Sequence, residues 1–145
     1  GGERPSTTKL RQVYSLVFPD ATIVKTGSKT AEMVKYMTNT FLATKVSFAN
    51  EMKLICDELK IDYDKVVEYS TYDERLGKSH WAVPGPDGKM GFGGSCFPKD
   101  INALIALSKD MRLYLHTLQS VWKTNLKVRP EKDWEELKGR AVTDE

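Results

Sequence analysis

The residues best suited to chemistry lie in the stretch Gly91–Asp100, which reads GFGGSCFPKD. One cysteine, Cys96, follows a glycine-rich turn and precedes Pro98, whose fixed φ suits the first position of a helix. The N-terminal end of a helix carries partial positive charge and unpaired N–H groups, which favour a thiolate placed just ahead of it. The sequence therefore predicts that Cys96 is a nucleophile.

Two charged residues follow the thiol at short spacing. Lys99 adds a positive charge three residues on, and Asp100 brings a carboxylate within reach of a group attached to the sulfur. A free cysteine is often a small buried hydrophobe, and that is the alternative for Cys96. The glycine turn and the Pro-Lys-Asp sequence around it favour the reactive form. Cys56 lies in an apolar run instead, and we expect it in the core.

The stretch Gly91–Asp100 resembles the catalytic cysteine segment of the UDP-glucose/GDP-mannose dehydrogenase family, a group of nucleotide-sugar dehydrogenases. A second stretch, residues 31–43, reads AEMVKYMTNTFLA and is similar to another signature of that family. The resemblance extends over nearly the whole chain. It implies the central, helical domain of such an enzyme.

Three polar residues gain a role only through this resemblance. Lys35 and Asn39 are four residues apart and share one helix face, where a solvated lysine and a neutral asparagine would be unremarkable. The resemblance implies that Lys35 stabilises developing negative charge and that Asn39 donates a hydrogen bond in the active site. For Arg75 the alternative is a surface salt bridge. The resemblance implies that it reaches the sugar-nucleotide site of a neighbouring subunit, a task that suits its planar donor fork.

The mechanism implied is a four-electron oxidation of a sugar-nucleotide primary alcohol to a carboxylate with two NAD. Thiolate Cys96 captures the intermediate aldehyde as a thiohemiacetal, and the thioester formed from it is hydrolysed. Asp100 positions or deprotonates the hydrolytic water. Phe92 and Gly93 line the sugar. Cys96 and Lys99 lie toward the cofactor.

Two other functions remain open at this point. No Gly-x-Gly-x-x-Gly follows a strand, so the sequence does not contain the dinucleotide-binding fingerprint, and the chain could be a non-catalytic dimerisation module. A cysteine hydrolase or thiol peroxidase would need a histidine paired with Cys96, and the spacing of His80 and His116 supports none. Neither histidine pairs with a cysteine at metal-ligand spacing, so we predict no metal site. The sugar stays open between gluco, manno and N-acetylated forms.

The overall composition describes an ordinary globular chain of 145 residues with a net charge of +2. The 22 basic and 20 acidic residues are interspersed, which gives no electrostatic support for binding nucleic acid or a membrane. We find neither an apolar run of membrane-spanning length nor a signal peptide at the start. A free reactive thiol fits a reducing compartment, so we predict a cytoplasmic location.

The strongest periodic pattern covers residues 28–60, where apolar residues recur every three or four positions without proline or glycine. It predicts one helix about 45 Å long. The apolar stripe is broad enough to contact more than one neighbour, so we expect a homodimer formed through this helix.

The remaining elements complete a mainly α fold. Residues 1–27 predict a helix over 7–17 capped by Ser6 and a strand over 21–26, which together would be an α/β remnant of a preceding NAD-binding domain. Residues 28–145 would form the central helical domain for dimerisation and catalysis. Its shorter helices are expected after a cap at Asp62 or Asp64, from residue 99, over 111–127, and from Pro130 to Gly139 with Trp134 packed on the body. Residues 141–145 are expected to be a frayed end.

Overall fold

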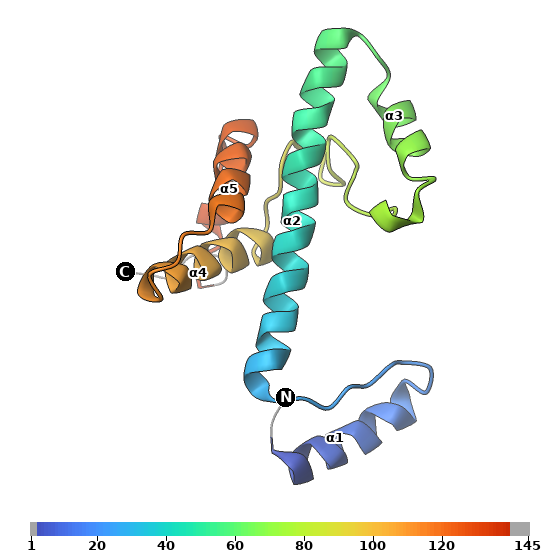
Figure 1. The fold of residues 1–145 in the computed structure, drawn as a ribbon, viewed down its shortest axis with the longest axis vertical. Helices are drawn as coiled ribbons and strands as arrows, with labels where there is room; N and C mark the ends of the chain where they lie inside the picture. The colour runs from blue at the N-terminus through green and yellow to red at the C-terminus, as the bar shows by residue number, and fades with distance from the viewer. Residues whose placement is uncertain (1–2, 140–145) are drawn as a thin grey trace. The chain divides into compact units, whose positions relative to one another are not determined.

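The computed structural model describes residues 3–139 (Figure 1). The elements are α1 (Arg4–Val17), α2 (Ser28–Leu59), α3 (Tyr63–Ser70), η1 (Glu74–Leu76), α4 (Cys96–Asp110), α5 (His116–Val128) and η2 (Asp133–Glu136). The predicted mainly α fold is confirmed, and the long helix predicted over 28–60 is α2. The chain divides between Thr38 and Asn39 into two compact units.

The first unit contains α1 and the beginning of α2. Helix α1 starts at Arg4, earlier than predicted, so Ser6 lies inside the helix and is not its cap. No residue of α1 is buried. The predicted strand over residues 21–26 is wrong, because that segment has no regular structure. A strand needs a neighbouring strand to pair its N–H and C=O groups, and residues 3–139 form none.

The second unit is built around the rest of α2. Figure 1 shows α4 and α5 on one side of this helix and α3 on the other. Two apolar clusters match this arrangement. The first joins α2 to α4 and α5 through Ala43, Phe92, Ile101 and Val121, and the second joins α2 to α3 through Ala49, Cys56, Tyr63 and Val83. Cys56 is only 4% exposed, which confirms its predicted place in the core.

The ends of the short helices follow local hydrogen bonding. The carboxylate of Asp62 accepts the backbone N–H groups of Asp64 and Lys65 at 3.0 and 3.2 Å, which confirms a predicted cap of α3. Helix α5 begins at His116 and not at 111 as predicted. Arg112 adopts a left-handed φ of 57°, and this turn ends α4 before the chain can continue as a helix.

The C-terminal segment folds back onto the second unit. The helix predicted from Pro130 to Gly139 is a single 3-10 turn, η2, because Lys132 in a left-handed conformation precedes it. Trp134 is 4% exposed, and its ring centroid lies 5.2 Å from that of Trp122 on α5. Its predicted packing on the body is confirmed. The predicted frayed end over 141–145 lies outside the described residues.

Candidate active site

Cys96 is the first residue of α4, and it is exposed. It therefore lies inside the first turn and not ahead of it, and Pro98 is the third helical residue. Proline is tolerated there because the first turn leaves its N–H groups without helical partners. The exposure of Cys96 excludes the alternative of a buried packing residue. A reagent or substrate can reach the sulfur at the positive end of the helix.

Asp100 lies one turn after Cys96 on the same helix, and it is fully buried. One of its oxygens accepts a hydrogen bond from Nδ2 of Asn39 at 2.6 Å, and the other pairs with the ammonium of Lys99. Hydrogen bonds to both oxygens hold the carboxylate in one orientation. The fold thus brings Asn39 to Asp100 across 61 positions of sequence.

The other polar residues of the predicted site are placed differently. Lys99 is partly exposed, with 41% of its side-chain surface open. Lys35 belongs to the first unit, where its ammonium lies 5.5 Å from the ring centroid of Tyr36. Arg75 lies on η1 with a side chain 89% exposed, paired with Asp73 on the same turn. The functional roles of these three residues stay predictions.

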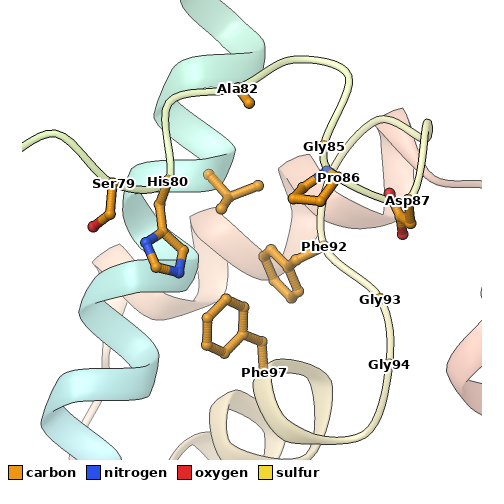
Figure 2. A pocket seen from close by; sticks show the side chains of 12 residues that line it. Ser79, His80, Ala82, Gly85, Pro86, Asp87, Phe92, Gly93, Gly94 and Phe97 are labelled. Atoms are coloured by element: carbon orange, nitrogen blue, oxygen red, sulfur yellow. The ribbon is translucent and has the colours of Figure 1, made fainter.

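A cavity of about 470 Å³ opens beside the cysteine loop (Figure 2). This volume falls within the range of small-molecule sites. Three segments line it, namely α2 through Val46, the loop over residues 79–87, and residues 91–97 of the cysteine loop and α4. Phe92 and Gly93, both predicted to line the sugar, are part of the wall.

Three aromatic rings line part of this cavity. The ring centroid of Phe97 lies 5.9 Å from that of Phe92 and 5.8 Å from that of His80. Figure 2 shows the three rings gathered on one side, with Asp87 on the opposite side. Such a surface suits the apolar face of a sugar or a base.

His80, Asp87 and Phe97 were not predicted as site residues. The sequence held two signals for them. His80 and Asp87 flank the Pro84–Pro86 turn, and Phe97 follows the nucleophile directly. Only the structure shows that the loop over residues 79–87 and the cysteine loop meet around one cavity.

Buried side-chain amides hold the backbone of the cysteine loop. The N–H of Gly91 donates to Oδ1 of Asn50 at 3.0 Å. Asn125 accepts the N–H of Phe92 at 2.7 Å and donates to its carbonyl at 2.9 Å. Gly91 has a φ of 66°, and a Cβ there would overlap Oδ1 of Asn125. The loop is therefore fixed by α2 and α5 and has no room for a side chain at this point.

Comparison with known proteins adds the family. The central domain of the UDP-glucose/GDP-mannose dehydrogenase family matches residues 29–127. The chain belongs to this family. The matched range includes Asn39, Arg75, Cys96 and Asp100, so the resemblance inferred from sequence is confirmed.

The relatives are named as UDP-glucose 6-dehydrogenases. TuaD of Bacillus subtilis (strain 168) is 39% identical over 109 residues, which are 75% of this chain and 23% of the relative. The enzyme of Rickettsia prowazekii (strain Madrid E) is 38% identical over 128 residues, which are 88% of this chain and 28% of the relative. A UDP-glucose dehydrogenase structure from Pyrobaculum islandicum superposes with a TM-score of 0.78 at 36% identity, covering 87% of this chain and 28% of that one. The chain thus spans about a quarter of the length of these relatives.

Within residues 3–139, no helix has both the length and the apolar character that a membrane span requires. The same part of the chain holds no group of three or more histidine, cysteine and acidic side chains arranged to bind a metal ion.

Proposed function

We propose that this chain supplies the cysteine part of the active site of a nucleotide-sugar 6-dehydrogenase. Such an enzyme oxidises the primary alcohol of a UDP- or GDP-linked sugar to the uronate. The observation that carries the proposal is the exposed Cys96 at the start of α4, one turn from the buried, oriented Asp100. The family and the names of its relatives supply the substrate class.

Bound NAD would supply the hydride acceptor for both oxidation steps, and Cys96 and Lys99 are the residues of this chain that would face it. The exposure of Cys96 and the part-exposure of Lys99 fit the predicted contact of both residues with that cofactor. The thiolate of Cys96 adds to the carbonyl carbon of the aldehyde, and the new oxyanion takes a proton to give a thiohemiacetal. Loss of the second hydride leaves a thioester on the sulfur.

Hydrolysis of the thioester falls to Asp100. Once the partly exposed Lys99 gives up its pair with Asp100, the carboxylate oxygen of that pair can position the water or take its proton as the water oxygen attacks the thioester carbon. The C–S bond then breaks to release the carboxylate and the thiolate. Asn39 holds Asp100 with one amide hydrogen, and its amide carries a second hydrogen that can donate to the oxyanion. The resemblance assigns oxyanion stabilisation to Lys35 as well.

The cavity beside the loop is the proposed place for the substrate. Gly93 presents bare backbone to it, and the rings of His80, Phe92 and Phe97 offer an apolar wall. The rings can stack on a sugar or base.

We also propose a homodimer through α2. In the second unit this helix leaves large apolar side chains about half exposed or more: Phe41, Phe48, Leu54, Ile55 and Leu59. A second copy would cover this surface and bring the exposed Arg75 to a neighbouring site. Sedimentation equilibrium should give twice the 16.4 kDa mass, and a Phe41→Glu, Leu59→Glu variant should give the monomer mass.

The catalytic proposal is tested in an enzyme that joins this chain to a dinucleotide-binding domain, because these 145 residues contain no dinucleotide fingerprint and we expect them to be inactive alone. The readout is NADH formation from UDP-glucose and, separately, GDP-mannose. Two NADH should form per sugar oxidised, and Cys96→Ala should lower turnover by at least about 10³-fold, as for removal of other covalent nucleophiles. Cys56→Ala is the matched control and should retain turnover. Full activity in Cys96→Ala would refute the proposal.

The alternative is a dimerisation module without catalysis of its own, favoured by the lack of a dinucleotide fingerprint in these 145 residues. It predicts a dimer that forms no NADH with either sugar nucleotide.

A further inference from the structure

Arg129 follows α5 and is only 2% exposed. A buried guanidinium destabilises a fold unless ion pairs and hydrogen bonds replace its water. It lies beyond the matched range, residues 29–127, and no step of the proposed mechanism uses it.

The guanidinium is engaged on all sides by one stretch before Cys96 and one after α5. Nε donates to Oδ1 of Asp133 at 2.6 Å, and Nη2 donates to Oδ2 of Asp133 at 3.0 Å. Nη2 also donates to Oδ2 of Asp87 at 2.7 Å, and Nη1 to the carbonyl of Met90 at 3.3 Å. The planar donor fork fixes all of these acceptors relative to one another.

The same group touches the cysteine loop itself. A Cβ on Gly93 would overlap Nη2 and Cζ of Arg129, so the loop backbone lies directly against the guanidinium. Hydrogen bonds from Arg129 lower the pKa of Asp133, and a hydrogen bond from the Gly94 backbone adds to that effect. Arg129 and Asp133 therefore contact Gly93 and Gly94, the two residues that directly precede Ser95 and Cys96.

A second ion pair joins the stretch before Cys96 to the stretch after α5. The ammonium of Lys89 lies 3.7 Å from a carboxylate oxygen of Glu131. Asp87, held by Arg129, also lines the cavity. The segment after α5 thus anchors the turn whose Asp87 lines the cavity as well as the loop that carries the nucleophile.

We propose that Arg129 is a positioning residue for Cys96 and for the cavity wall. It holds Asp87, Met90 and Gly93 through one buried guanidinium, and Asp133 completes its pairing. The value of this role for catalysis rests on the proposed function, but the geometric claim can be tested without it.

The test uses Arg129→Met, with Lys127→Met as a matched control that removes an exposed cation near the end of the same helix. The first readout is amide hydrogen exchange of the loop peptide, in which Gly91 and Phe92 donate to buried amides. We expect at least tenfold faster exchange of these amides in Arg129→Met, and wild-type exchange in Lys127→Met.

The second readout is alkylation by iodoacetamide of Cys96 and Cys56 in the same sample. If the guanidinium positions the loop, the alkylation rate of Cys96 in Arg129→Met should fall toward the rate measured for Cys96 in the urea-unfolded chain. Cys56, in the other apolar cluster, should stay protected. Loss of fold would instead expose both thiols.

Asp133→Asn keeps the side-chain size and weakens one pair, so it decides the question if Arg129→Met fails to fold. In Asp133→Asn, loop exchange and Cys96 alkylation rates between those of the wild type and Arg129→Met, with Cys56 still protected, support the proposal. The proposal is overturned if a folded variant shows wild-type exchange and alkylation rates. It is also overturned if the alkylation rates of Cys56 and Cys96 change equally. A different result would separate the two proposals. If Cys96 of the wild-type chain is alkylated no faster than in urea while the loop amides still exchange faster in Arg129→Met, the proposed nucleophile is refuted and the positioning role of Arg129 stands.

Discussion

The two irregular segments that carry proposed site residues are held in opposite ways. The loop before Cys96 is enclosed by the buried side chains of Asn50, Asn125 and Arg129. The η1 turn with Arg75 is held by two side chains at its end: the ammonium of Lys45 donates to the carbonyl of Leu76 at 2.9 Å, and Nε1 of Trp81 donates to the carbonyl of Gly77 at 2.8 Å. Arg75 itself extends into solvent. A nucleophile has to be fixed within its own chain before substrate arrives, whereas a residue offered to another surface is fixed when that surface binds.

The largest effect is expected from Asn125→Ala. It removes both bonds to Phe92 and leaves a buried N–H and carbonyl without partners, which should lower the free energy of unfolding by about 4 kcal/mol. Urea denaturation measures this. Asn102→Ala, at an exposed position of α4, is the control. It loses a single hydrogen bond, from Nδ2 to the carbonyl of Pro98 at 2.8 Å, so the expected change is about 1 kcal/mol or less. Equal effects would mean that the loop is not held by Asn125.

A smaller effect is expected from Lys45→Met, which tests the hold on the η1 turn. The ammonium lies 4.8 Å from the ring centroid of Trp81 in addition to its bond to Leu76, and burial lowers its pKa. Losing both contacts should cost about 1–2 kcal/mol of unfolding free energy. Lys53→Met on the same helix removes only an exposed pair with Asp57 and should cost about 0.5 kcal/mol or less. A change in Trp fluorescence should accompany Lys45→Met alone.

Acid should weaken the cysteine loop before the rest of the fold. Hydrogen bonds from Arg129 hold the pKa values of Asp87 and Asp133 below the ordinary value of about 3.9. Because the folded values are lowered, this stabilisation is complete above that pH and is lost as pH falls through the lowered values. The protection of the loop amides, measured as the observed exchange rate relative to the intrinsic rate at each pH, should therefore fall below about pH 4. This loss of protection should be absent in Arg129→Met, and its persistence there would assign it to other groups.

The smallest effect on stability is expected from Arg75→Ala. Its pair with Asp73 is open to solvent, so the midpoint of urea unfolding should not change. Turnover by the dimer should fall, because the proposed role lies in a neighbouring site. A shifted midpoint together with unchanged turnover would make Arg75 a local structural residue.

The sequence predicted those features that depend on local pattern. Helix α2 followed from its periodicity, the cap of α3 from Asp62, and the packing of Trp134 from an apolar residue in a polar segment. The start of α4 was misplaced because Pro98 suits several positions of a first turn.

The contacts that fix the loop could not be predicted in this way. Asn50 and Asn125 bond to the loop across 41 and 33 positions of sequence, and Arg129 bonds to Met90, just before it, across 39. No local pattern encodes such pairings. Each residue alone reads as an ordinary polar side chain on a helix or just after one.

The central claim is that the fold presents Cys96 as a prepared nucleophile. The most direct measurement is the rate of iodoacetamide alkylation of each cysteine by mass spectrometry, in the folded chain and in urea. We predict that folded Cys96 reacts faster than Cys96 in urea, while folded Cys56 is protected. A folded Cys96 that reacts no faster than in urea, or no faster than Cys56, would contradict the claim.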